Sequence, residues 1–153
     1  MATFKRFEEL EIWQLAREMC IEIEKLIEVD LYYKNRRLKD QIQGSSGSVM
    51  DNIAEGFEKE STKEFINYLF YAKGSCAEMR SQLVRMTDLG YFSSEMTKPL
   101  ITNAEEISRK IKRFIIYLQS IEHKGNRYAQ EPTAKYGIEI PENLNFEFFK
   151  EIN

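Results

Sequence analysis

Two short basic clusters have the residue types and spacing of a phosphate-binding surface. The first cluster consists of Lys34, Arg36, Arg37 and Lys39. The second cluster consists of Arg109, Lys110, Lys112 and Arg113. Such clusters can contact the phosphate backbone of RNA or DNA without reading its sequence. A solvated helix face is the simpler explanation of either cluster taken alone, so both interpretations stay open.

Catalytic and metal-binding chemistry finds little support in the chain. Asn52 and Glu55 are polar residues within an otherwise apolar helical segment, but neither has an acid, base or metal ligand at a supporting spacing. We expect both to hydrogen-bond to helix ends or neighbouring side chains. His123 is the only histidine, whereas a di-iron bundle needs Glu-x-x-His pairs on two helices. We therefore expect no enzymatic activity, no metal and no cofactor.

A glycine-rich stretch, GSSGSVMDNIAEG, begins at Gly44 and ends at Gly56. It lacks the GxxxxGK[ST] spacing and the preceding strand of a phosphate-binding loop. We interpret it as part of a helix, in which Gly44 and Gly47 each destabilise by about 1 kcal/mol relative to alanine. The predicted compensation is the close approach of a facing helix or of a bulky ring such as Trp13.

Three segments repeat apolar residues at alternating spacings of four and three, and we call each such row an apolar stripe. The first stripe consists of Ile12, Ala16, Met19, Ile23 and Leu26. The next consists of Phe65, Leu69, Ala72, Cys76, Met79, Leu83 and Met86. The last consists of Leu100, Ala104, Ile107, Ile111, Phe114, Leu118 and Ile121. A period of 3.5 residues is typical of helices that pack side by side at shallow angles.

Capping residues predict where these helices begin and end. The first helix is expected over about residues 7–28. Ser61, with a glutamate three residues later, has the capping-box pattern of a helix start. Gly90 is placed to close the same helix. The stretch SSEM at 93–96 can cap the last helix. Since proline is tolerated mainly in a first helical turn, Pro99 favours a start nearer residue 97.

Together these patterns predict an all-α fold, an antiparallel up-down-up-down four-helix bundle over residues 1–123. Residues 124–153 contain two of the three prolines and no sustained apolar stripe, which predicts an extended C-terminal tail. The tail is acidic and rich in aromatic residues, which argues against free disorder. We expect it to pack on the bundle or on a neighbouring subunit.

The composition restricts the class of protein and its partners. The 153 residues carry a net charge of −3, so whole-chain charge does not indicate nucleic-acid binding. No window approaches the roughly 18 apolar residues of a membrane span. Glutamates at positions 8, 9 and 11 are untypical of a signal peptide, so we expect a cytoplasmic protein. Cys20 and Cys76 are expected to be buried and reduced.

Four stretches of the chain stand out together. They are FEELEIWQLAREM, the NIAEG motif with Asn52, Glu55 and Gly56, the stretch KEFINYLFYAKGSCAEMRSQL, and LGY at 89–91. With them the chain, over roughly residues 4–122, resembles the bacterial four-helix-bundle proteins encoded in intervening sequences of 23S rRNA genes. The third contains a GS-x-x-E element that begins at Gly74. That family also looks related to the accessory variability proteins of diversity-generating retroelements.

The resemblance implies a homopentameric ring and no enzymatic activity. The family usually carries basic residues just after the glutamine that Gln41 matches, whereas this chain has Gln43 and Gly44 there. In a ring, five copies of a basic cluster could form a continuous electropositive collar. Apolar residues beside the stripes also predict self-association, and they are Tyr68, Phe70, Tyr71, Ile115, Ile116 and Tyr117.

Two functions therefore remain to be distinguished. The leading hypothesis is a non-catalytic homo-oligomeric scaffold associated with ribosomal RNA or retroelement nucleoprotein. The alternative is an adaptor that recruits an unidentified protein through its acidic, aromatic tail, without nucleic acid. Phosphate contacts weaken steeply as salt is raised, whereas apolar docking does not, so salt dependence separates the two.

Overall fold

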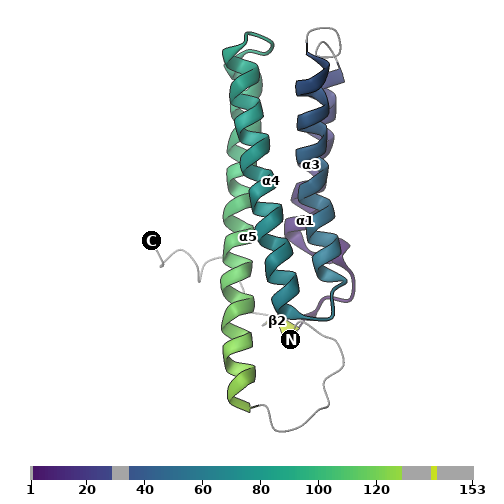
Figure 1. Cartoon of the computed structure of the whole chain (residues 1–153), viewed down its shortest axis with the longest axis vertical. Coiled ribbons are helices and arrows are strands. Elements are labelled where there is room, and N and C mark those ends of the chain that lie inside the picture. Colours follow the sequence, from purple (N-terminus) through teal and green to yellow (C-terminus); the bar gives the residue numbers. More distant parts are fainter. Residues whose placement is uncertain (1, 29–34, 129–138, 141–153) are drawn as a thin grey trace.

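The computed structural model describes residues 2–28, 35–128 and 139–140 and shows four long helices. They are α1 (Glu11–Glu28), α3 (Arg36–Phe57), α4 (Thr62–Asp88) and α5 (Ser94–Tyr128), and successive helices run in opposite directions (Figure 1). Around the bundle α1 contacts α3, α3 contacts α4, α4 contacts α5, and α5 returns to α1. The predicted antiparallel four-helix bundle is confirmed, and α3 and α5 lie diagonally opposite each other.

The apolar stripes form one core. Every residue predicted for the stripes of α1 and α4 is buried. In α5 the stripe shifts near its middle, where Ile115 is buried and Phe114 is only partly buried. A straight helix has 3.6 residues per turn, so a 3.5-residue pattern drifts around its surface. The ring of Phe114 still packs edge-on against Phe65, with centroids 5.7 Å apart.

The first helix begins later than predicted. Phe7–Glu9 form a separate 3₁₀ turn, η1, and α1 starts only at Glu11. Between them Leu10 has an extended backbone, with φ −74° and ψ 124°. This bend directs Leu10 into the core, where its side chain is 2% exposed. The Phe7 ring packs edge-on against Trp13 at a centroid distance of 5.2 Å, which holds the turn against α1.

The last helix begins earlier than Pro99 suggested. The carbonyl of Ser93 accepts hydrogen bonds from the backbone amides of Met96 and Thr97, at 3.0 and 3.2 Å. These bonds start α5 at Ser94, so Pro99 lies in its second turn and removes one helical donor there. The helix therefore begins within the predicted capping stretch 93–96, and the later start near residue 97 was wrong because local bonds at Ser93 fix the helix start.

Both predicted ends of α4 are confirmed. The backbone amide of Glu64 donates to the Ser61 hydroxyl at 3.5 Å, so Ser61 caps α4. Gly90 has φ +70° just beyond the end of α4, a conformation that favours glycine. The start of α3, for which no cap was predicted, is capped by Asn35, whose side chain accepts from the amide of Leu38 at 3.0 Å.

The C-terminal part of the chain returns to the N-terminus. Helix α5 runs to Tyr128, beyond the bundle boundary predicted at residue 123. Two short strands, β1 (Ala2–Thr3) and β2 (Glu139–Ile140), then pair antiparallel, with Ala2 opposite Ile140. The rest of the predicted tail, residues 129–138 and 141–153, lies outside the described residues.

Candidate functional site

A row of polar contacts joins α3 and α4 along their shared face, and we call it the α3–α4 polar row. From the end where α4 stops, its contacts are Arg85 to Gln41 (2.6 Å), Ser45 to Gln82 (2.6 Å), Ser75 to Ser48 (3.0 Å) and Tyr68 to Glu55 (2.6 Å). Three of these residues are serines, whose small size permits close packing of the helices. The glycine- and serine-rich stretch is therefore used, in part, to hold α3 against α4.

The glycines of that stretch are of two kinds. A Cβ atom at Gly56 would lie 2.6 Å from Cβ of Tyr68 and 2.8 Å from Cδ2 of Phe65, so α4 leaves no room for a side chain there. A Cβ atom at Gly44 or Gly47 would meet nothing within 4 Å. The predicted close approach of a helix or ring is thus wrong for Gly44 and Gly47 within one chain, because both positions face open space.

The closely packed residues of this stretch are instead the two serines between Gly44 and Gly47. Ser45 and Ser46 are 4% and 1% exposed. The hydroxyl of Ser45 donates to Gln82 of α4, while that of Ser46 lies 3.8 Å from Sγ of Cys20 in α1. Because adjacent positions on α3 point to different neighbours, this serine pair contacts both flanking helices.

The polar residues of the NIAEG motif are partnered as predicted. Nδ2 of Asn52 donates to the carbonyl and hydroxyl oxygens of Ser48, at 2.7 and 2.9 Å. The Tyr68 hydroxyl donates to Glu55 at 2.6 Å, and Lys59 lies 3.4 Å from the same carboxylate oxygen. The bond from Tyr68 is the main reason why the pKa of Glu55 is lowered, with a smaller effect of Lys59. The same bond raises the pKa of Tyr68.

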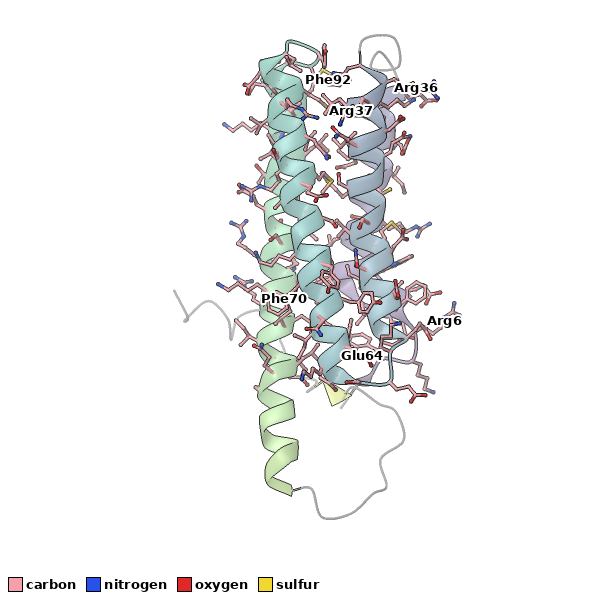
Figure 2. All side chains as sticks on the ribbon, in the orientation of Figure 1. Arg6, Arg36, Arg37, Glu64, Phe70 and Phe92 are labelled. Carbon is pink, nitrogen blue, oxygen red and sulfur yellow. The ribbon has the colours of Figure 1, made fainter. Side chains whose placement is uncertain are left out.

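The structure separates the two predicted basic clusters. Arg36 and Arg37 are exposed at the start of α3 (Figure 2), Lys39 is partly buried, and Lys34 lies outside the described residues. The second cluster lies midway along α5, on the diagonally opposite helix. At about 1.5 Å of rise per residue, Arg109 is roughly 22 Å from the start of α5. The clusters therefore do not form one surface within a chain.

Within the second cluster, Lys110 forms an ion pair that joins two helices of the bundle. Nζ of Lys110 lies 2.8 Å from a carboxylate oxygen of Glu11 in α1, and its side chain is only 13% exposed. Arg109 and Lys112 are exposed and Arg113 is partly exposed. None of these three forms an ion pair with another residue in the described ranges. We call Arg109, Lys112 and Arg113 the α5 basic row.

The outward surface of α4 includes a row of uncharged residues along much of its length. Its outward positions are Phe70, Gly74, Ala77, Ser81 and Val84, which we call the α4 outer stripe. Phe70 and Val84 are 51% and 45% exposed, and the adjacent Tyr71 is 62% exposed. Gly74, singled out in the sequence, lies here, and a Cβ atom at this position would meet nothing within 4 Å.

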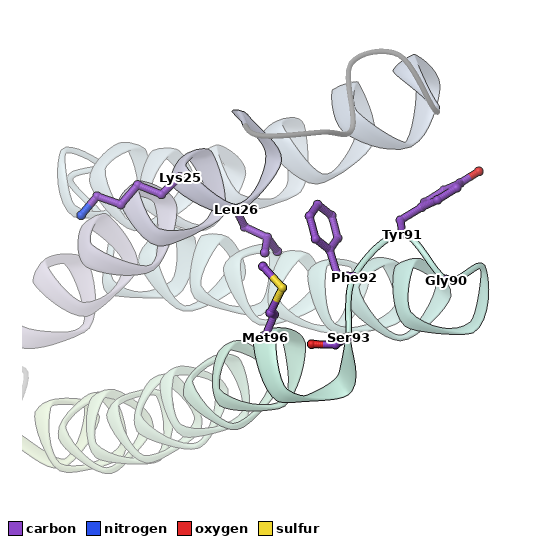
Figure 3. Close-up of a pocket in the computed structure, with 7 residues that line it drawn as sticks. All are labelled: Lys25, Leu26, Gly90, Tyr91, Phe92, Ser93 and Met96. Carbon is purple, nitrogen blue, oxygen red and sulfur yellow. The ribbon is translucent and has the colours of Figure 1, made fainter.

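A pocket of about 440 Å³ opens at the end of the bundle where α1 stops and α4 turns into α5. Leu26, Tyr91, Phe92 and Met96 supply most of its lining, and Lys25 is its one charged residue, extending away from Met96 (Figure 3). The other polar groups of this mainly apolar lining are the hydroxyls of Tyr91 and Ser93.

Within the described part of the chain, no group of three or more His, Cys, Asp and Glu residues is arranged to hold a metal ion. The described helices also include none that is long and apolar enough to cross a membrane. Both cysteines are free, Cys20 being half-buried and Cys76 fully buried. Burial raises the pKa of Cys76 to about 12, so its thiol is unreactive at neutral pH.

The family model of the 23S rRNA-intervening sequence protein matches residues 8–113. This chain belongs to that family. The part matched by the intervening-sequence protein model covers α1, α3, α4 and α5 through the α5 basic row, but not the C-terminal tail.

A comparison with solved structures supports the fold of this intervening-sequence protein. The chain is similar to a crystal structure of a protein of unknown function from the S23 ribosomal protein family of Bacteroides thetaiotaomicron. The two are 23% identical with a TM-score of 0.64, over 68% of this chain and 97% of the other. At this identity the likeness shows the fold alone. A comparison with curated proteins gave no match.

Sequence reasoning missed most of the α3–α4 polar row. A signal was present, because Tyr68, Ser75 and Gln82 recur every seven residues, on the α4 side that faces α3. Such a polar stripe beside an apolar one predicts a second helix contact, but it does not say which helix supplies the partners.

Proposed function

We propose that this protein is a non-catalytic, homo-oligomeric helical scaffold of the cytoplasm that binds the phosphate backbone of RNA. The observation that carries the proposal is the α5 basic row, where three cations share one side of a helix without an acidic partner in the described ranges. Arginine and lysine on such a face contact phosphate without sequence preference. The family description refers to intervening sequences of 23S rRNA, which makes ribosomal RNA the first polymer to test.

Self-association is proposed from the exposed apolar side chains. Phe70, Tyr71 and Val84 on α4 and Ile116 on α5 are each 45% or more exposed. Large apolar side chains that cluster on a surface usually mark an interface. If the homopentamer implied by the family resemblance forms, it repeats the α5 basic row around a ring and multiplies its affinity for a long polyanion.

The test is RNA binding at about 50 and 200 mM salt, with a variant that changes Arg109, Lys112 and Arg113 to glutamine. Lys110 is left intact because it contacts Glu11 and supports the packing of α1 on α5. Three phosphate contacts to single-stranded RNA predict that affinity falls about 20-fold over this range. The triple variant should lose that binding while keeping its helical circular dichroism.

The matched control is the double variant R36Q/R37Q, which removes two exposed cations from the other cluster. It should retain most of the binding, because Arg36 and Arg37 lie far from the α5 basic row. Equal binding by the wild type and the triple variant would contradict the proposal. No binding at low salt would favour the alternative, an adaptor that recruits a protein through its acidic aromatic tail.

A further inference from the structure

Helices α4 and α5 each have a stretch without acidic residues, and the two stretches lie side by side. Helix α4 has no acidic residue over 65–77, and α5 has none over 107–121. The rings of Phe65 and Phe114 pack edge-on with centroids 5.7 Å apart, so the two stretches adjoin. The cations on this part of the surface are therefore not offset by a carboxylate from either stretch.

An ion pair shows which positions of α4 and α5 face each other along their seam. Nη2 of Arg80 lies 2.5 Å from a carboxylate oxygen of Glu105, so both positions border the neighbouring helix. Seven residues make almost two complete helical turns and return to nearly the same side. Because the helices are antiparallel, the next positions along the seam are Lys73, seven residues before Arg80, and Lys112, seven residues after Glu105. Two lysines thus take the places that hold opposite charges one heptad away.

The two lysines form a like-charged pair across the seam. Lys73 is partly buried and Lys112 is exposed. Neither has an ion pair or a hydrogen bond with another residue in the ranges that the structure describes. Arg109 lies three residues before Lys112, on the same side of α5, and adds a third positive charge. Like charges placed this way repel each other, and a phosphate group between them removes the repulsion.

An exposed aromatic ring lies beside these cations. Phe70 precedes Lys73 by three residues, so it shares the side of α4 that borders α5, and its side chain is 51% exposed (Figure 2). Ile116, four residues after Lys112, is 47% exposed on the facing part of α5. Unpaired bases stack on such rings, whereas the bases of a duplex are already stacked on one another. Cations for phosphate beside a ring for a base are the combination that binds single strands.

We infer that the α4–α5 seam at Lys73 and Lys112 binds single-stranded RNA, with a phosphate between the two lysines and a base stacked on Phe70. The inference rests on the proposed RNA binding and adds the form of the RNA and two residues outside the α5 basic row, Lys73 and Phe70. Contacts of the α5 basic row to phosphate do not by themselves distinguish a single strand from a duplex. The preference for a single strand therefore depends on the ring.

Fluorescence anisotropy with a labelled oligouridine of about 12 nucleotides, and with an RNA duplex of the same length, tests the role of Phe70. F70L keeps an apolar residue but removes the ring, so it should weaken binding of the single strand about fivefold or more and leave the duplex unchanged. F70Y should bind like the wild type. The matched control is V84A, since Val84 is also exposed on α4 but lies beyond Arg80. Equal binding of the single strand by F70L and the wild type would overturn the inference.

An RNA strand without bases separates stacking from other effects of the F70L substitution. Abasic RNA of the same length keeps every phosphate but offers nothing to stack on the ring. F70L and the wild type should therefore bind it equally. If F70L weakens abasic RNA or the duplex as much as the oligouridine, the loss comes from the fold or from association of the protein, and stacking on Phe70 is refuted.

The salt dependence of binding tests the phosphate position. Loss of one phosphate contact to a single strand in K73Q should reduce the slope of log affinity against log salt concentration by about 0.7. The matched control is K98Q, because Lys98 is exposed on α5 but lies roughly 21 Å along the helix from Lys112. An unchanged slope in K73Q would overturn the phosphate position. RNA binding by the wild type that neither F70L nor K73Q changes overturns this inference alone, whereas no binding at low salt overturns the proposed function as well.

Discussion

The polar residues of the NIAEG motif are joined to neighbouring side chains. Asn52 bonds within its own helix and Glu55 bonds to Tyr68 across to α4. The lowered pKa of Glu55 arises from hydrogen bonding at the surface, with Tyr68 as the main cause. A catalytic carboxylate usually has a pKa perturbed by burial together with a specific charge in a cleft. These residues therefore support a structural role for the motif.

The bond between Tyr68 and Glu55 predicts a pH-dependent contribution to stability. Because the folded-state pKa of Glu55 lies below its ordinary value of 4.5, this contribution is present above that value and is lost as pH falls through the folded-state pKa. Y68F should be less stable than the wild type at about pH 7, and the difference should shrink as the pH falls below the ordinary pKa of 4.5 and through the lowered folded-state pKa of Glu55. Urea denaturation midpoints at several pH values measure it.

The control for this prediction is the variant E55Q, which cannot titrate at position 55. Y68F in the E55Q background should have an effect that does not change between neutral and acidic pH. A Y68F effect that is equally large at both pH values in the wild-type background would show that ring packing, rather than the carboxylate bond, is responsible.

At the level of the helices, α3 combines two kinds of contact on adjacent faces. One face supplies Leu38, Ile42, Val49 and Ile53 to the core, where each is at most 1% exposed. The next face supplies the α3 half of the α3–α4 polar row. Apolar packing tolerates small shifts, whereas hydrogen bonds need their partners at fixed positions. The polar row therefore specifies the register of α3 against α4.

The two kinds of glycine in α3 predict opposite effects of alanine. G56A should destabilise by about 1–3 kcal/mol, because its methyl group would overlap Tyr68 and Phe65. G44A should stabilise by up to about 1 kcal/mol, because alanine favours the helix and the position is open. Chemical denaturation of both variants at one protein concentration measures the difference. A stabilising G56A would mean that α4 moves away without loss, contrary to the close contact seen.

At the scale of the whole molecule, the α4 outer stripe and the α5 basic row lie on neighbouring helices. Self-association would place the α5 basic rows of several copies on one assembly, so that a polyanion could contact more than one of them. Two linked binding surfaces bind a long ligand more tightly than either one alone. Self-association and RNA binding are thus expected to reinforce each other.

Self-association predicts that thermal stability depends on protein concentration. Because only the folded chain associates, raising the concentration 100-fold should raise the Tm of the wild type by about 5 °C. Differential scanning fluorimetry or calorimetry from low to high micromolar concentration measures this. A Tm of the wild type that does not depend on concentration would argue against association in that range.

Much of this architecture is encoded by residues close together in the chain and can be predicted from the sequence alone. The alternation of four and three residues predicted the buried stripes of α1 and α4, because helical geometry relates each residue directly to those three and four positions away. Ser61 and Gly90 marked helix ends for equally local reasons. The motif order around Asn52, Glu55 and Gly56 indicated the family.

Other features depend on which helices become neighbours. The two basic clusters looked alike in sequence, but Lys110 contacts Glu11 while Arg36 and Arg37 lie on the diagonally opposite helix. Gly44 and Gly56 also looked alike, yet only Gly56 is crowded by α4. Helix neighbours are set when all apolar stripes are buried together, so these contacts between distant residues cannot be read from local spacing.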